Sequence, residues 1–206
     1  MSDVLETPTG TRDRLLAAAL EITREGGYGA ASVVAIADRA GVAAGTLYRH
    51  FPSKGELFAE LFRTVCSGEV EAMRAADPGP SATATARAEE VIATFAGRAL
   101  HTPRLAWALI AEPVDPLVDA ERLAYREAYR ELLATLVRAG IEDGSLPPQD
   151  ADLTAAAIVG GVGEALVGPT SPLSGAAPDA QEIVRALRIF VRRALGAARS
   201  DQEETG

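Results

Sequence analysis

The chain has 206 residues, of which 48 % are hydrophobic and 5 % aromatic, so its core is expected to consist mainly of Ala, Leu, Val and Ile. The formal net charge of −9 excludes a protein coated with nucleic acid over its whole surface, yet residues 1–54 carry six basic and six acidic side chains, which leaves the entire −9 on the remainder. The single cysteine, Cys66, excludes an internal disulfide, and because no signal-peptide pattern opens the chain, we expect a protein of the reducing cytoplasm.

Helical spacing recurs along the chain and strand patterns are nearly absent, so we predict an all-α fold of about nine helices. The first helix is expected to begin after Thr9 or Thr11 as its N-cap and to stop at Gly26-Gly27. The hydroxyl of Ser32 can cap a second helix. A third, very short helix is expected over Ala44–Phe51.

A tight turn, Ala40-Gly41-Val42, separates the second helix from the third. Gly supplies the positive φ or the space that such a turn needs, and a buried apolar residue after it fixes the crossing of the two helices. Leu47 and Phe51, four residues apart, would hold the third helix on the core. This layout predicts a helix-turn-helix over about residues 32–51, within a segment, residues 31–54, that carries three basic side chains and one acidic.

These residues resemble the tetracycline-repressor (TetR) family of bacterial transcriptional regulators. The matching residues are Ile36-Ala37, Ala40-Gly41-Val42, Gly45-Thr46-Leu47-Tyr48, His50-Phe51, Ser53-Lys54 and Leu57-Phe58. The resemblance implies a helix-turn-helix DNA-binding domain over residues 9–69, followed by a ligand-sensing and dimerisation domain over residues 70–206. It also implies a homodimer that binds a double-stranded operator and responds to a small-molecule effector.

The resemblance implies a DNA contact for the outward residues of the helix-turn-helix. Tyr48 and Lys54 are expected to contact phosphate. Arg49 can form a bidentate contact with guanine, whereas His50 is expected to support the module or to touch phosphate. The other expected DNA contacts are Ser32, Val34, Ala43, Ala44, Gly45 and Thr46.

The chain departs from the family pattern at two places. Many relatives carry Ser and then a longer polar residue where this chain has Ala43-Ala44, and many carry Arg or another polar residue where it has Val34. Polar base readout should therefore be sparse, and Ala44 and Val34 are expected to contact thymine methyl groups.

A capping box, Ser53 to Glu56, begins a fourth helix that is apolar on two adjacent stripes, so this helix can link two parts of the protein. The break Ala76–Pro80 follows it. Five further helices are expected around residues 91–100, between Pro103 and Pro113, over residues 119–142 and 150–167, and around residues 183–195. Residues 200–206 have nothing apolar to bury and are expected to be disordered.

The eighth predicted helix carries Gly160, Gly161 and Gly163 in its interior, where each costs about 1 kcal/mol relative to Ala. Small residues four apart leave one face flat, either for internal packing or for a homodimer interface shared with the ninth helix. The expected interface residues are Ala157, Gly160, Gly161, Ala165, Leu187, Phe190 and Val191. No membrane partner is expected, because the apolar run Leu153–Val167 contains Glu164 and is shorter than the roughly 20 residues that span a bilayer.

Aromatic and thiol side chains on the fourth to seventh helices are candidates for the wall of an effector cavity, although each could also be plain core. These candidates are Phe62, Cys66, Phe95, Trp107, Tyr125 and Tyr129. Glu112 could attract a cationic ligand or be a solvated helix end beside Pro113. We expect Cys66 to be an inert buried thiol.

No catalytic pattern accompanies these features. The histidines His50 and His101 follow Leu47 and Arg98 at the spacing where di-iron bundles carry Glu, and no HExxH, CxxC, P-loop or G-x-S-x-G occurs. We therefore expect no enzyme, no metal and no cofactor. The expected function is a ligand-released repressor of a palindromic operator, and the alternative is a helical ligand-binding or scaffolding protein without sequence-specific DNA binding.

Overall fold

The computed structural model describes residues 10–175 and 179–196, and within them the chain forms nine α-helices and no strand. The all-α prediction is confirmed. In chain order the helices are α1 (Thr11–Ala30), α2 (Val33–Arg39), α3 (Ala44–His50), α4 (Lys54–Ala76), α5 (Ala84–His101), α6 (Pro103–Ile110), α7 (Pro116–Glu142), α8 (Ala151–Thr170) and α9 (Ala180–Ala194). The N-cap role of Thr9 and the disorder of residues 200–206 concern residues outside the described part.

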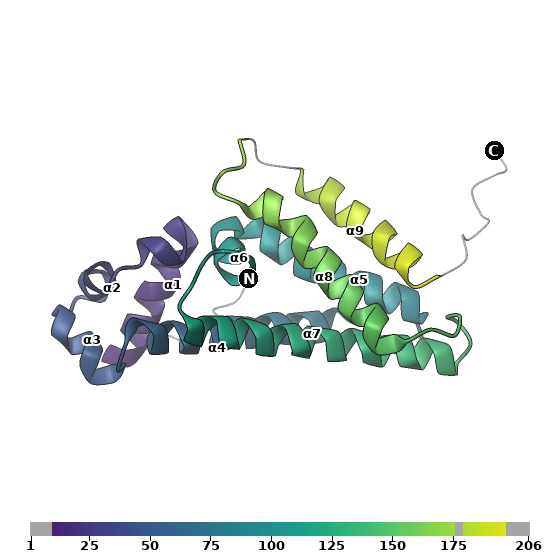
Figure 1. The fold of residues 1–206 in the computed structure, drawn as a ribbon, viewed down its shortest axis with the longest axis horizontal. Helices are drawn as coiled ribbons and strands as arrows, with labels where there is room; N and C mark the ends of the chain where they lie inside the picture. The colour runs from purple at the N-terminus through teal and green to yellow at the C-terminus, as the bar shows by residue number, and fades with distance from the viewer. Residues whose placement is uncertain (1–9, 176–178, 197–206) are drawn as a thin grey trace.

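The molecule is elongated, with α1, α2 and α3 gathered at one end (Figure 1). The long helices α4 and α7 run side by side away from that end, and α8 and α9 cross above them. We call α1 to α3 with the first half of α4 the N-terminal module. This module joins the rest of the chain through α4 and through the packing of α1 against α6.

Helix α1 contains a break at Gly27, where φ is 82° and ψ is −178°. The predicted stop at Gly26-Gly27 is right for the regular part of the helix, but one further turn continues to Ala30. Glycine adopts this backbone conformation without the steric cost that a Cβ brings. At the start of α2 the predicted cap is present, because Ser32 Oγ accepts the N–H of Ala35 at 3.1 Å.

Two clusters of buried side chains hold the helices together. The first lies inside the N-terminal module, includes Leu47 and Phe58, and takes in Leu105 from α6. The second lies among the C-terminal helices and includes Met73 from the last part of α4. α4 therefore contributes to both clusters, as its two apolar stripes predict, and the expected domain boundary after residue 69 falls inside a continuous helix.

Helix α9 is tied to α5 by two bidentate ion pairs. Arg188 donates to both carboxylate oxygens of Glu90 at 2.7 and 2.8 Å. Arg192 donates to both oxygens of Glu89 at 2.7 and 3.1 Å. Paired nitrogen and oxygen atoms in this fork geometry fix orientation as well as distance, so α9 is held in one register on α5.

Helix α8 continues through Pro169 to Thr170, beyond the predicted end near Val167. Among the described residues, α8 is the one helix that is long and apolar enough to cross a membrane, with 20 residues and a mean hydropathy of 1.4. The prediction from the run Leu153–Val167 alone therefore underestimated the length of this apolar helix. Only 28 % of this segment is buried inside the chain. α8 therefore presents apolar surface that the described part of the chain does not cover.

Candidate nucleic-acid interface and internal cavity

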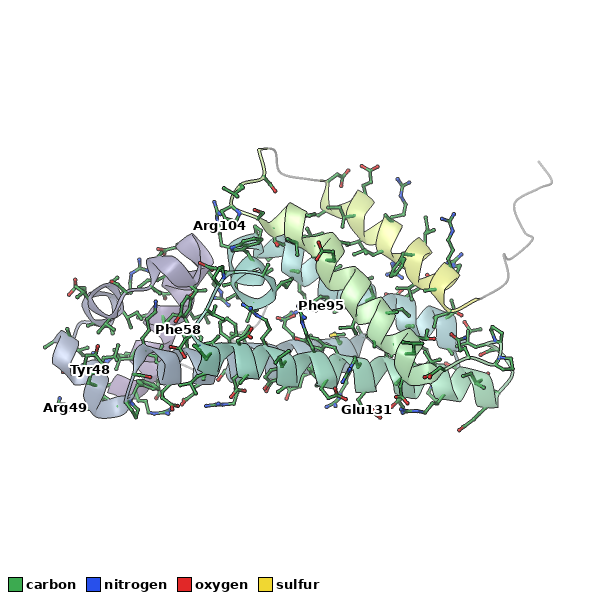
Figure 2. The ribbon with its side chains drawn as sticks, in the orientation of Figure 1. Tyr48, Arg49, Phe58, Phe95, Arg104 and Glu131 are labelled. Carbon is green, nitrogen blue, oxygen red and sulfur yellow. The ribbon has the colours of Figure 1, made fainter. Side chains whose placement is uncertain are left out.

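The turn between α2 and α3 has the geometry that the sequence predicts. Gly41 has a φ of 68°, and the N–H of Val42 donates to the carbonyl of Ala37 at 3.0 Å. Leu47 and Phe51 are buried in the module and hold α3 in place. The opposite side of α3 is exposed, and Figure 2 shows Tyr48 and Arg49 at the tip of the molecule.

Most of the predicted DNA-contact residues lie on the surface of this tip. Val34 and Tyr48 are 59 % and 56 % exposed, so packing inside the module does not account for either side chain. Thr46 and Lys54 are half-buried. The exposed predicted contacts are Ser32, Val34, Ala43, Ala44, Gly45, Tyr48, Arg49 and His50.

Fewer positive charges on this surface are free to contact DNA than the composition suggests. Arg39 is paired with Glu25 at 2.9 Å and with Glu21 at 3.3 Å, both from α1. Arg49 has no ion-pair partner among the described residues, so its guanidinium is available. A Cβ built on Gly45 would meet nothing within 4 Å, so packing inside the module does not require glycine there.

Lys54 lies differently from the other predicted contacts. Its Nζ donates to the carbonyl of Tyr28 at 3.3 Å and lies 4.0 Å from the centroid of the Tyr28 ring. Burial lowers the pKa of Lys54, while the nearby carboxylates of Glu112 and Asp115 act in the opposite direction. A phosphate contact by Lys54 remains a prediction, and it requires the side chain to turn away from Tyr28.

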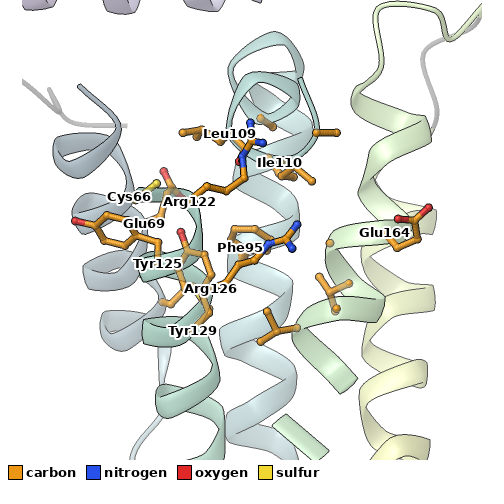
Figure 3. Close-up of a pocket in the computed structure, with 18 of the residues that line it drawn as sticks. Cys66, Glu69, Phe95, Leu109, Ile110, Arg122, Tyr125, Arg126, Tyr129 and Glu164 are labelled. Carbon is orange, nitrogen blue, oxygen red and sulfur yellow. The ribbon is translucent and has the colours of Figure 1, made fainter. Parts of the chain in front are cut away.

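A cavity of about 760 Å³ opens among α4, α5, α6, α7 and α8. Four of the six predicted wall residues line it, and Figure 3 shows all four: Cys66, Phe95, Tyr125 and Tyr129. Phe62 lies one turn before Cys66 and is buried in the N-terminal module, and Trp107 is not part of the wall. The apolar pattern identifies the inward faces of α4 and α6 but not which inward residue borders a void.

The aromatic side of the cavity is closely packed. The rings of Phe95 and Tyr129 have their centroids 5.4 Å apart. Burial raises the pKa of the Cys66 thiol to about 12, although a hydrogen bond with Tyr129 acts against this shift. The thiol is therefore protonated at neutral pH, as expected for an inert buried cysteine.

Sequence reasoning missed a row of arginines in the cavity wall. Arg122, Arg126 and Arg130 follow each other at intervals of four along α7 and all line the cavity. Arg130 is paired with Glu127, whereas Arg126 is exposed and has no ion-pair partner in the described ranges. The four-residue spacing next to two predicted wall tyrosines was the available signal, but arginines on a helix usually indicate a solvated face.

Glu112 has neither of the two roles considered from the sequence. It is not part of the cavity wall, and it does not end α6 in solvent. Its carboxylate accepts the N–H groups of Tyr28 at 2.8 Å and Gly29 at 2.9 Å, more than 80 positions earlier in the chain. No local sequence pattern could reveal a contact between segments so far apart.

Six of the seven residues predicted for a dimer interface fall into two groups. Ala157, Gly160 and Ala165 are exposed on α8, and Phe190 of α9 is 39 % exposed. Leu187 and Val191 are buried in the core of their own chain, so their assignment to an interface is corrected: they form the inner face of α9.

Gly161 packs within one chain. A Cβ on Gly161 would lie 3.0 Å from Cζ of Phe190, so this glycine allows α9 to approach α8. Gly160 and Gly163 line the cavity and have nothing within 4 Å of a built Cβ. Internal packing therefore accounts for one of the three glycines.

The described residues contain no group of three or more His, Cys, Asp and Glu side chains that could hold a metal ion.

Comparison with known proteins places these features in a family. Residues 15–61 match the family described as "Bacterial regulatory proteins, tetR family". The chain is 32 % identical over 144 residues to the HTH-type transcriptional repressor KstR2 of Rhodococcus jostii, a match that covers 66 % of this chain and 68 % of that protein. It is 56 % identical over 46 residues to the HTH-type transcriptional repressor KstR of Mycobacterium tuberculosis, covering 22 % of this chain and 21 % of that protein.

A solved structure shares the fold over most of the chain. The transcriptional regulator FadR from Bacillus subtilis, crystallised in complex with stearoyl-CoA, aligns with a TM-score of 0.74 and 23 % identity. The alignment covers 86 % of this chain and 96 % of that chain. At this identity the likeness concerns the fold.

Proposed function

The chain belongs to the TetR family of bacterial regulatory proteins and is a DNA-binding transcriptional regulator, and we propose that it acts as a repressor that a small-molecule effector releases from its operator. The observation that carries the proposal is the exposed face of α3 at the tip of the molecule, joined by α4 to a helical body that contains a cavity. We propose residues 9–69 as the DNA-binding domain, residues 70–206 as the ligand-sensing and dimerisation domain, and the cytoplasm as the site of action.

α3 is the element that we propose to enter the major groove. Arg49 supplies a planar fork that can bind both acceptors of guanine, and Tyr48 and Ser32 supply hydroxyl groups for phosphate. The bare exposed surface of Gly45 supports a close approach of DNA there, since glycine costs about 1 kcal/mol in a helix and no internal contact requires it. Val34 and Ala44 offer apolar contact to thymine methyl groups.

The uncovered surface of α8 supports a homodimer. Exposed apolar or small residues recur along it at helical spacing, and Phe190 of α9 lies beside them. Packing against a second copy of the chain would remove this apolar surface from water. A twofold dimer would present two α3 helices to successive major grooves, about 34–36 Å apart, and would therefore favour a palindromic operator.

The cavity favours an effector with an apolar body and an anionic group. A volume of about 760 Å³ lies within the range of small-molecule sites, and Phe95 and Ile92 provide apolar wall. Arg126 of α7 offers a cation that has no ion-pair partner within residues 10–175 and 179–196, and Glu164 is the wall carboxylate on the α8 side. The stearoyl-CoA complex of FadR, which shares the fold, supports an acyl-CoA thioester as the effector class.

Binding selection from fragmented genomic DNA, followed by sequencing, tests the DNA-binding part of the proposal. We expect enriched fragments to share an inverted repeat, because a dimer reads two related half-sites. The double variant Tyr48→Ala, Arg49→Ala serves as the control and should enrich no common motif. Equal recovery of random fragments by both proteins would favour the scaffolding alternative.

Calorimetric titration with stearoyl-CoA tests the effector class. Arg126→Gln should weaken binding by about tenfold to hundredfold, because a hydrogen bond to a charged group contributes about 1.5–3 kcal/mol. Arg74→Gln, on the exposed last turn of α4, changes the net charge by the same amount and should leave the affinity unchanged. Equal affinities for all three proteins would remove the assigned role of Arg126.

A further inference from the structure

The last turn of α1 is capped by a distant carboxylate. Because the helix breaks at Gly27, the N–H groups of Tyr28 and Gly29 have lost the acceptors that a continuous helix would give them. The Glu112 carboxylate accepts both, at 2.8 and 2.9 Å. A Cβ on Gly27 would lie 2.8 Å from Oε2 of Glu112, so the glycine also makes room for this contact.

The same turn is held from its other side by α4. The carbonyl of Tyr28 accepts a hydrogen bond from Lys54, the first residue of α4. The aromatic ring of Tyr28 lies edge-on to that of Phe58, with the ring centroids 4.7 Å apart. Ser32, the N-cap of α2, follows this turn by two residues. The placement of the turn therefore sets where the helix-turn-helix begins.

Glu112 is itself held in place from the cavity. The guanidinium of Arg122, in the cavity wall, donates to the carbonyl oxygens of Glu112 at 2.8 Å, Ala108 at 2.9 Å and Leu109 at 2.9 Å. These carbonyls belong to the C-terminal end of α6 and the loop after it, where helix carbonyls lack intrahelical partners. The Arg122 side chain is only 12 % exposed, and this burial lowers its pKa.

We propose that Arg122 and Glu112 are positioning residues that transmit the state of the cavity to the helix-turn-helix. The proposal rests on the proposed ligand-controlled DNA binding and adds the contacts through which that control acts. Arg122 fixes the end of α6, and Glu112 links this end to the last turn of α1. The position of that turn determines where α2 begins and, through its hydrogen bond with Lys54, where α4 begins.

An anionic effector would act on this series of contacts at Arg122. A carboxylate or phosphate in the cavity competes for the guanidinium with the three carbonyls and with the Asp119 carboxylate, which lies 3.2 Å from Arg122 Nη1. An anion can displace the carbonyls because it adds the attraction of opposite charges to the hydrogen bonds. When Arg122 turns to the effector, the end of α6 and Glu112 lose their anchor. The effector can shift the equilibrium only by its preference for this second arrangement, in which α2 and α3 are no longer held for DNA.

Amide hydrogen exchange, followed by NMR on the full chain without DNA or effector, tests the contacts directly. The variants are Glu112→Gln and Arg122→Lys, with Arg126→Lys as the matched control in the same wall. We expect exchange at the Tyr28 and Gly29 amides to accelerate by about tenfold in both variants, because glutamine offers one acceptor oxygen and lysine lacks the planar fork. Arg126→Lys should leave both rates within about twofold of the wild type.

The buried amide of Leu61 on α4 reports global opening and should exchange alike in all four proteins, which separates a local effect from a general loss of stability. Unchanged exchange at Tyr28 and Gly29 in Arg122→Lys would overturn the proposal, even if the wild type binds an operator. The converse failure is distinct: a wild type that enriches no DNA overturns the proposed function, whatever the exchange rates show.

The second measurement concerns control of DNA binding. On an operator obtained by selection, stearoyl-CoA should raise the dissociation constant of the wild type and of the control Arg74→Lys, which changes an exposed arginine outside the cavity wall. In Arg122→Lys this increase should be smaller by about fivefold or more, the lower end of typical coupling between sites. An increase equal to that of the wild type would show that the control bypasses Arg122, and would also overturn the proposal.

Discussion

Arg49 is the side chain on which the proposed base recognition depends most. It lies exposed in the last turn of α3, and no carboxylate among the described residues competes for it. Arg49→Ala should cost about 1–3 kcal/mol of operator binding and relax the preference at one base step, because a bidentate contact to guanine is lost. Fluorescence anisotropy on the operator and its single-base variants measures both effects.

The control for Arg49 is Arg74→Ala, which removes an exposed arginine from the far end of α4. It should leave affinity and base preference unchanged. If Arg49→Ala weakened all base variants by the same factor, Arg49 would be a phosphate contact and the reader of sequence would lie elsewhere.

Two features require glycine at position 27, namely its backbone conformation and the close contact with Glu112. Its φ of 82° with ψ near 180° is a conformation that only glycine adopts readily, and Glu112 Oε2 would lie 2.8 Å from an added Cβ. Gly27→Ala should therefore reduce the free energy of unfolding by about 1–3 kcal/mol in urea titrations.

The matched control is Gly68→Ala, in the interior of α4, where an added Cβ meets nothing within 4 Å. Alanine should stabilise this helix by about 0.5–1 kcal/mol. If the two substitutions changed stability by the same amount, the special role assigned to Gly27 would be wrong.

At the scale of single residues, the sequence predicts which side chains are buried or exposed where this depends on residues nearby in the sequence. The periodicity that buries Leu47 and Phe51 also exposes Tyr48 and Arg49, so the outward face of α3 could be read directly. The orientation of Lys54 toward Tyr28 and the contact of Glu112 with α1 depend on segments that the chain brings together only after folding. No spacing rule reaches across such separations.

At the scale of helices, caps and breaks set most boundaries correctly. Ser32 and Ser53 cap α2 and α4 as predicted, because a hydroxyl three residues before a free N–H is a local feature. Periodicity also identified the apolar face of α9, but it could not tell whether that face meets its own chain or a second copy. Leu187 and Val191 were assigned to the interface for that reason and belong to the core.

The proposed dimer is tested on the outer face of α8. Ala157 is exposed there, so Ala157→Glu should leave the fold of each chain intact and bury a charge in the interface. We expect the wild type to sediment as a dimer and Ala157→Glu as a monomer in analytical ultracentrifugation.

Ala124→Glu, at an exposed position of α7, is the control for added negative charge and should remain dimeric. A dimeric Ala157→Glu would move the interface away from this face of α8.

At the scale of the whole molecule, the fold class and four residues of the cavity wall could be predicted, whereas the volume of the cavity and the rest of its wall could not. An alternation of helices, caps and breaks suffices for an all-α fold, whereas a void of about 760 Å³ depends on how five helices fail to fill the space between them. The arginines of α7 can be assigned to a ligand site only once this cavity is known. The path from Arg122 to Glu112 likewise exists only in the assembled structure, since it joins α7, the end of α6 and α1.

The central claim is that the occupant of the cavity controls the affinity for DNA. It is tested most directly by the dissociation constant of the wild-type protein for a selected operator, measured with and without saturating stearoyl-CoA. We predict an increase of about tenfold or more on addition of stearoyl-CoA, which corresponds to a coupling free energy of about 1.4 kcal/mol. An unchanged dissociation constant, with calorimetry showing that stearoyl-CoA is bound, would contradict the claim.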